Sequence, residues 1–379
     1  MTYAPSLDHA EINHLASIRM KRGIALLDEG DPEALDEAVG CFDEAIELRR
    51  GLPLAGHPGF RYGLAAGWIN RGDALARMAG PENLSEAVNS HTTAIELLRE
   101  VPADDDEGLF VRRLSIAWLN RGIALEKQER EGASAEAARS YREAIRLLTG
   151  CAGKRAGRLD RVLASAWINL GNALLRAPGG ALADEARDAA ERALSLLGGS
   201  ESSDEEAAEA GLKARHILCQ AATILLGKTS PGESDPMDLI GKLTDAVESA
   251  LDLAQSWERA GVTRFSPLAA QFFHFGALVY ERHQPHFLAD FLLDYLAPEV
   301  AGRSARVDAT WFAIAGESLA RARARLGQSE ITLLTAPQCA RKLEILCEVR
   351  AAEAICNAAL SRSVPEQSAR TSEVGLSIC

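Results

Sequence analysis

The chain has 379 residues, a net charge of −13 at pH 7, and 47% hydrophobic but only 5% aromatic residues. An acidic chain repels the phosphate backbone of nucleic acids, so we expect no nucleic-acid partner. No run of about 20 apolar residues is present to span a bilayer. Residues 1–8 lack the basic and then apolar layout of a signal peptide, so the sequence predicts a cytoplasmic protein with no membrane partner.

One pattern recurs four times between residues 10 and 200. Each copy is anchored on a glycine, and the glycines stand 49, 50 and 49 residues apart: Gly23, Gly72, Gly122 and Gly171. Leucine stands eight residues before and three residues after each glycine, and alanine stands 15 and 22 residues after it. Four residues before it stand Arg19, Trp68, Trp118 and Trp167. A fixed period in this range indicates a solenoid or array.

The spacings place these residues on helices. Leucine, tryptophan, glycine and the second leucine share one face of a first helix, and the two alanines belong to a second helix. Breakers such as Gly80-Pro81 separate the two helices, and Asp31 before Pro32 is typical of a helix N-cap. The sequence therefore predicts an all-α solenoid of stacked antiparallel hairpins. We expect helix backbones to approach closely at the glycines and alanines.

These positions resemble the tetratricopeptide repeat (TPR) family. Its first helix carries Trp, Leu, Gly and an aromatic residue, and its second carries Ala, an aromatic residue and Ala. Trp68, Gly72, Leu75, Ala87 and Ala94 match that pattern. The resemblance covers about residues 10–200, half of the chain, and implies a superhelix whose concave face binds a protein or peptide. The period exceeds the ~34 residues of the family, so helices or connections must be longer.

The second half of the chain repeats the pattern less clearly. Residues 198–206 combine Gly, Ser and acidic residues, which favours a linker, so we predict a first domain over residues 1–200. Three degenerate hairpins should continue or cap the solenoid over 201–360, with helical patterns at 212–226, 239–257, 268–279, 287–296, 311–326 and 340–360. Residues 361–379 are polar and are predicted to form a flexible tail.

A second stripe on each first helix points away from the tryptophan and would line the inner wall of the solenoid. In successive copies one row reads Lys21, Asn70, Asn120 and Asn169, and another reads Asp28, Arg77, Lys127 and Arg176. In the TPR family, Asn and Lys or Arg on this face hold acidic side chains or the terminal carboxylate of a peptide. The resemblance therefore implies a peptide-binding wall of Lys21, Asn70, Asp73, Arg77, Asn120, Lys127, Asn169, Asn172 and Arg176. Structural contacts are the alternative role for the asparagines.

No catalytic motif occurs: the sequence lacks a phosphate-binding glycine loop, Gly-x-Ser-x-Gly and His-Glu-x-x-His. His283 and His286 flank a helix-breaking proline, and the seven cysteines form no CxxC pair, so we expect no metal and no cofactor. These observations predict a non-catalytic scaffold or adaptor that binds a protein or peptide. The alternative is that the aromatic C-terminal half binds a small ligand or supports an enzymatic partner.

Overall fold

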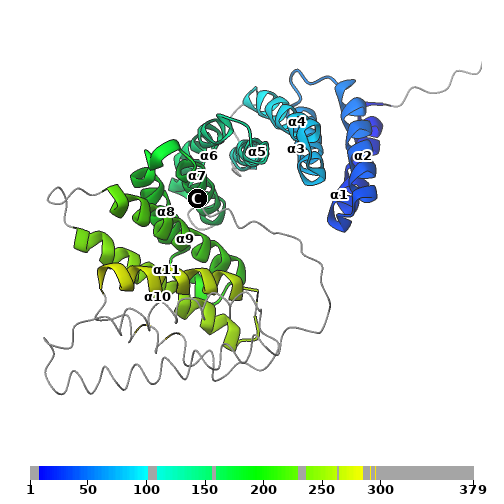
Figure 1. The fold of residues 1–379 in the computed structure, drawn as a ribbon. Helices are drawn as coiled ribbons and strands as arrows, with labels where there is room; N and C mark the ends of the chain where they lie inside the picture. The colour runs from blue at the N-terminus through cyan, green and yellow to red at the C-terminus, as the bar shows by residue number, and fades with distance from the viewer. Residues whose placement is uncertain are drawn as a thin grey trace, which may run out of the picture. The chain divides into compact units, whose positions relative to one another are not determined.

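The computed structural model describes residues 8–100, 109–155, 159–228, 236–262 and 264–284, together with Phe291 and Tyr295. Every regular element in these ranges is a helix (Figure 1). The chain divides into two compact units, Met1–Lys228 and Thr229–Cys379, which are described separately below. None of the described helices combines the length and the apolar run that crossing a membrane requires.

The first unit consists of four helical hairpins and one further long helix (Figure 1). The first helices of the hairpins, called A helices below, are α1 (His9–Glu29), α3 (Pro58–Met78), α5 (Leu109–Glu126) and α7 (Asp160–Leu175). Their partners, the B helices, are α2 (Pro32–Arg50), α4 (Pro81–Arg99), α6 (Ala133–Arg155) and α8 (Ala183–Leu197). The last helix is α9 (Glu205–Lys228), and the short 3-10 turns η1 (Pro178–Gly180) and η2 (Ser200–Ser202) flank α8.

Packing in the first unit follows the order of the chain. Each A helix packs on its own B helix, each B helix packs on the next A helix, and successive A helices also touch one another. The alanines 15 and 22 residues after each glycine are fully buried in all four copies: Ala38, Ala45, Ala87, Ala94, Ala137, Ala144, Ala186 and Ala193. The predicted all-α array of sequential helix pairs is therefore confirmed.

Helix ends form where the sequence supplies caps. The side chain of Asp31 accepts a hydrogen bond from the backbone N–H of Ala34, and Pro32 lies in the first turn of α2, as predicted. Asp8 and Glu11 form a capping box at the start of α1. At the other end of α1, Gly30 adopts a left-handed conformation with φ 77°, which glycine reaches without a Cβ clash.

In the first three copies the repeated glycine accommodates a ring from the B helix. The pairs are Gly23 with Phe42, Gly72 with His91, and Gly122 with Tyr141, and the ring stands 19 residues after the glycine each time. A Cβ atom at Gly122 would lie only 2.4 Å from the Tyr141 ring. In these copies the prediction that helix backbones meet at the glycine is wrong, because a ring occupies the space.

The fourth copy fills the same space differently. Ala190 stands 19 residues after Gly171, so its B helix supplies no ring. Ile217 of α9 fills the gap, with a side-chain atom 3.0 Å from where a Cβ of Gly171 would stand. The added helix α9 therefore completes the packing of the last hairpin.

The first unit extends past residue 200, so the predicted domain break at that position is wrong. Gly198 and Gly199 adopt left-handed conformations with φ 57° and 82°, and the chain turns there to place α9 against α7 and α8. Arg215 of α9 forms an ion pair with Glu201, which anchors the short segment between α8 and α9. The glycine- and serine-rich stretch is thus a tight turn, and the unit boundary follows Lys228.

In the second unit the structure describes α10 (Pro236–Arg259) and α11 (Ser266–His283), which pack on each other and extend the patterns predicted at 239–257 and 268–279. Phe272 and Phe273 are buried, and the rings of Phe273 and Phe291 stack with centroids 5.6 Å apart. Aromatic side chains therefore form a core here. The predicted helices at 311–326 and 340–360 and the predicted tail at 361–379 lie outside the described residues.

Candidate functional site

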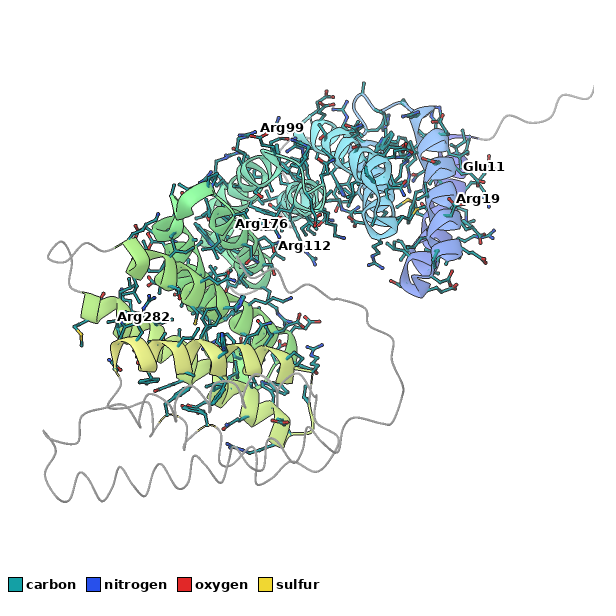
Figure 2. All side chains as sticks on the ribbon, in the orientation of Figure 1. Glu11, Arg19, Arg99, Arg112, Arg176 and Arg282 are labelled. Carbon is teal, nitrogen blue, oxygen red and sulfur yellow. The ribbon has the colours of Figure 1, made fainter. Side chains whose placement is uncertain are left out.

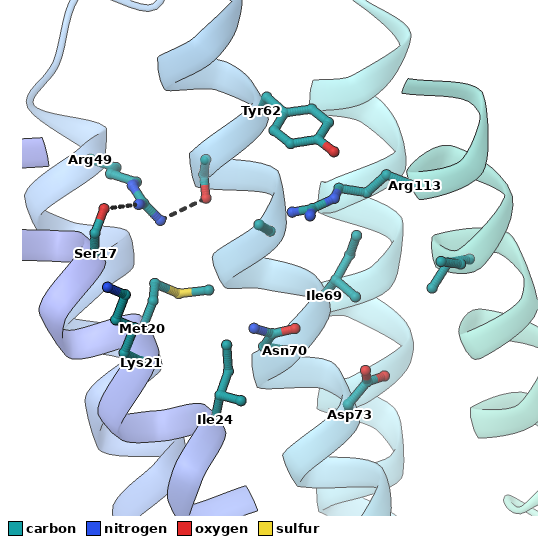
Figure 3. A pocket seen from close by; sticks show the side chains of 13 residues that line it. Ser17, Met20, Lys21, Ile24, Arg49, Tyr62, Ile69, Asn70, Asp73 and Arg113 are labelled. Carbon is teal, nitrogen blue, oxygen red and sulfur yellow. Dashed lines mark hydrogen bonds between the residues drawn. The ribbon is translucent and has the colours of Figure 1, made fainter. Parts of the chain in front are cut away.

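The A helices of the first three copies line a groove with a volume of about 540 Å³, called the first groove below (Figure 3). Its apolar lining is Met20, Ile24, Ala66, Ile69 and Ile116. Its polar lining is Ser17, Lys21, Arg49, Tyr62, Asn70, Asp73 and Arg113. The groove therefore combines an apolar floor with a cluster of cationic and amide groups.

A second groove of about 330 Å³ lies between α5, α7 and α9. Asn120 and Asn169 line it together with Ile123 and Ser165. The structure thus places Lys21, Asn70 and Asp73 of the predicted wall in the first groove, and Asn120 and Asn169 in the second. Arg77, Lys127, Asn172 and Arg176 line neither of these two grooves.

The basic row of the predicted wall connects each copy to the one before it. Arg77 donates a hydrogen bond to the carbonyl oxygen of Leu27 at 2.8 Å, and Lys127 donates to that of Ala76 at 3.0 Å. Both carbonyls lie in the last turn of the preceding A helix, where carbonyl groups lack partners within the helix and attract positive charge. Lys228 at the end of α9 makes a similar contact with the carbonyl oxygen of Gly180.

Arg176, labelled in Figure 2, continues this row and lies 3.5 Å from a carboxylate oxygen of Glu126 in the preceding copy. Arg77, Lys127 and Arg176 therefore hold adjacent copies together, a role that the sequence analysis did not assign to them. Their part in ligand binding stays a prediction.

The asparagines of the wall differ in their contacts. Asn120 donates to a carboxylate oxygen of Asp73 at 2.7 Å, which links α5 to α3. Asn70, Asn169 and Asn172 are half-buried, and within the described part of the chain they make no side-chain hydrogen bond. Lys21 is exposed and likewise has no ion pair among the described residues. Asn70 and Lys21 are therefore the predicted residues of the first groove that remain available to a ligand.

A buried histidine lies behind the first groove, and the sequence analysis did not find it as a site. His91 Nε2 is 3.6 Å from a carboxylate oxygen of Asp73, and neither imidazole nitrogen has a hydrogen-bond partner. Burial, with a smaller effect from Arg121, lowers the pKa of His91 to about 3. Burial also raises the pKa of Asp73 to about 7, although Asn120 and Arg77 oppose the change.

The repeats contain a signal for this pair. The positions of Asp73 and His91 are taken by Ile24 and Phe42 in the first copy, and by Ile123 and Tyr141 in the third. The second copy therefore replaces an apolar residue and an aromatic residue with two titratable groups that meet in space. Comparing copies position by position would have identified it.

Arg49 is the second group that the sequence analysis missed. It is 6% exposed, and the other copies carry Leu98, Leu148 and Leu197 at its position in the B helix. Its guanidinium donates to Asn13 Oδ1, to the carbonyl oxygen of Gly63 and to Ser17 Oγ, at 3.1, 2.9 and 3.0 Å. All three acceptors are neutral. Across the groove, the guanidinium of Arg113 lies over the ring of Tyr62, 4.3 Å from its centroid.

Among the described residues, no group of three or more His, Cys, Asp or Glu side chains is placed to hold a metal ion. Cys41 and Cys219 are buried and unpaired. Burial raises the pKa of the Cys219 thiol to about 12, so this thiol is protonated and unreactive at neutral pH.

Comparison with known proteins adds little to this description. No family model matches the chain, and no curated protein matches it. One similar solved structure is a circular tandem repeat protein with novel repeat topology and enhanced subunit contact surfaces. It shares 15% sequence identity at a TM-score of 0.38, over 93% of this chain and 85% of that one. This likeness is too weak to support an argument, and the helical tandem-repeat architecture rests on the helices and their contacts.

Proposed function

We propose that the chain is a TPR-type binding protein of the cytoplasm, which holds a segment of a partner protein in the first groove and acts as a scaffold or adaptor without catalysis. One observation carries the proposal. Lys21 and Asn70 line a groove with an apolar floor, and within the described part of the chain they have no partner of their own.

The groove offers complementary contacts to a peptide segment. An apolar side chain of the segment would cover Ile24, which is 42% exposed, and gain the free energy of removing that surface from water. The amide of Asn70 can both donate to and accept from a peptide backbone. Lys21 would pair with an acidic side chain of the segment through a charge-assisted hydrogen bond.

The binding residues proposed here are fewer than the predicted wall. Arg77 and Lys127 already donate to the preceding A helix, and Asn120 donates to Asp73. Lys21 and Asn70 therefore form the proposed binding set, and Asp73, which accepts the hydrogen bond from Asn120, lines the groove beside them. Asn169 lines the second groove, which a longer segment would reach along α5, the helix that lines both grooves.

The test begins with short peptides selected from a displayed library on the immobilised full-length chain. Their affinities are then measured by fluorescence anisotropy for the unmodified chain, for the double variant Lys21→Ala/Asn70→Ala, and for the control Asn89→Ala, which changes an exposed asparagine on α4. We expect the double variant to bind at least about tenfold more weakly, equivalent to 1.4 kcal/mol, and the control to bind normally. Equal affinities, with all three chains folded by circular dichroism, would reject the proposal.

A further inference from the structure

Positive charge gathers at the end of the first groove that is formed by the early turns of α1, α3 and α5. Arg49 and Arg113 line this part of the groove, whereas Lys21 stands further along α1, near the level of Asn70 (Figure 3). The acidic residue that lines the groove, Asp73, follows Tyr62 by 11 residues on α3. That separation is about 16 Å along the helix axis, so Asp73 does not neutralise this end.

Arg49 is a buried charge without a counter-ion in the described part of the chain. Its three hydrogen bonds go to an amide oxygen, a backbone carbonyl and a hydroxyl. Burial and the nearby charge of Arg113 both lower its pKa, and no carboxylate offsets them. A buried charge that lacks a counter-ion is costly, and Arg49 stands where three other copies carry a core leucine.

The fold provides room for this arginine. A Cβ atom at Gly63 would lie 3.0 Å from Nε of Arg49, so the glycine lets the guanidinium pass beside α3. Tyr62, the residue before it, supports Arg113 from α5 through its ring. In Figure 3 the guanidinium groups of Arg49 and Arg113 point toward one another from opposite sides of α3.

Arg113 is available to a ligand. Apart from its position over Tyr62, it has no hydrogen bond or ion pair among the described residues, so its five N–H donors are open. An oxyanion that enters this end of the groove would therefore meet the planar donor group of Arg113, with the charge of Arg49 beside it.

We propose that this end of the first groove is an anion subsite that binds a phosphate monoester carried on the bound segment. The proposal rests on the proposed function, because it assumes that a segment lies in the groove. Arg113 contacts the phosphate oxygens, and Arg49 contributes its charge while it keeps its present hydrogen bonds. Neither Arg49 nor Arg113 belongs to the wall that the sequence predicts.

The number of charges favours a phosphate over a carboxylate. Two cations, Arg49 and Arg113, face the subsite, and a single carboxylate would leave one of them without compensation. A phosphate monoester carries a charge of about −1.5 to −2 at pH 7 and three strong acceptor oxygens. Planar guanidinium groups match this geometry with paired hydrogen bonds.

The test uses a small probe, N-acetyl-phosphoserine amide, titrated with the full-length chain and followed by ³¹P NMR. Arg113→Gln removes the open guanidinium. The matched control is Arg112→Gln, which removes an exposed arginine one position earlier that does not line the groove (Figure 2). N-acetyl-glutamate amide, added as a competitor at equal ionic strength, compares a carboxylate with the phosphate.

We expect saturable binding to the unmodified chain, a loss of at least about tenfold in Arg113→Gln, and no change in Arg112→Gln. The glutamate analogue should compete at least about tenfold more weakly than the phosphoserine probe. Equal binding by the two variants, or equal competition by the glutamate analogue, would overturn the phosphate subsite. If the probe binds but the peptides bind Lys21→Ala/Asn70→Ala with the same affinity as the unmodified chain, only the proposed function fails. If the peptides respond to that variant but no probe binds, only the subsite fails.

Discussion

The pair formed by the half-buried Asp73 and the fully buried His91 should give the first unit two opposite pH dependences, which single substitutions will separate. The pKa of Asp73 is raised from 3.8 to about 7 in the folded state, so its stabilising contribution is full below pH 3.8 and is lost as the pH rises to 7. The pKa of His91 is lowered from 6.5 to about 3, so its contribution is full above pH 6.5 and is lost as the pH falls to 3. The two slopes oppose each other over the same range.

The magnitudes decide whether the effect is measurable. A pKa change from 3.8 to about 7 corresponds at most to about 4 kcal/mol. The Asp73 side chain is 30% exposed, so screening by water should reduce its contribution to about 2 kcal/mol. His91 is fully buried, and the part of its pKa change that falls between pH 4.5 and 6.5 corresponds to about 2–3 kcal/mol with the opposite sign. The nearby cations are Arg77, which acts on Asp73, and Arg121, which acts on His91.

In Asp73→Asn only His91 of the pair can still titrate. The free energy of local opening at α3 and α4 should then rise by about 2 kcal/mol from pH 4.5 to 7. In His91→Phe only Asp73 of the pair can still titrate, and the free energy of local opening should fall by about 2 kcal/mol over the same pH range. Hydrogen exchange of the full-length chain, read by mass spectrometry and corrected for intrinsic exchange, measures this free energy for α3 and α4 separately from the other repeats. His57→Gln, at an exposed histidine, is the control. If both variants keep the slope of the unmodified chain, the assigned protonation states are wrong.

Two further substitutions test the packing between and within copies. Gly122→Ala places a methyl group 2.4 Å from the Tyr141 ring and should lower the free energy of unfolding, measured in urea, by about 1–3 kcal/mol. The control Gly40→Ala has nothing within 4 Å of the new atom and should raise this free energy by about 0.5–1 kcal/mol. Equal stabilities of the two variants would contradict the packing of the Tyr141 ring against Gly122. Lys127→Met should weaken hydrogen-exchange protection at the end of α3 by about 1 kcal/mol, because the Ala76 carbonyl loses its donor. The control Lys213→Met breaks an exposed ion pair within α9 and should change local stability by less than about 0.5 kcal/mol. If Lys127→Met has no larger effect than this control, the hydrogen bond from Lys127 to the Ala76 carbonyl does not stabilise the contact between copies.

The sequence predicts the array well because each copy repeats the same packing. The fixed spacing of Gly72 to Ala87 and Ala94 predicts a hairpin, and these alanines are fully buried in the structure. The end of the unit could not be predicted in the same way. Two glycines with polar neighbours suit both a linker and a tight turn, and only the packing of α9 on α8 distinguishes them.

The binding wall shows a second limit of sequence analysis. Helical periodicity places Lys127 and Asn120 on the face opposite the tryptophan, but it does not say which group each side chain reaches. Lys127 finds a carbonyl group 51 residues earlier in the chain, and Asn120 finds a carboxylate 47 residues earlier. Such contacts depend on the distance between stacked A helices, which the sequence spacing does not contain.

Differences between copies locate the candidate site better than their shared residues do. Leucine, glycine and alanine recur because every hairpin needs the same packing, so these positions say nothing about a ligand. Arg49 replaces a leucine that the three other copies share, and Asp73 and His91 replace the isoleucine and the aromatic residue of the first and third copies. Arg49 and Asp73 line the first groove, and His91 lies directly behind Asp73.

The replacements at Arg49 and His91 lower stability when considered alone, because they put a charge and an unpaired polar group where the other copies bury apolar or aromatic side chains. In the described part of the chain, Arg49 finds no carboxylate and His91 finds no hydrogen-bond partner. If these substitutions were random losses of packing, they should be scattered over the four copies. They instead meet around one groove, which Arg113 also lines. At the position of Arg113 in the repeat, the first two copies carry His14 and Gly63. A ligand that brings negative charge into the first groove accounts for the clustering, and it compensates the positive charges that the array leaves open.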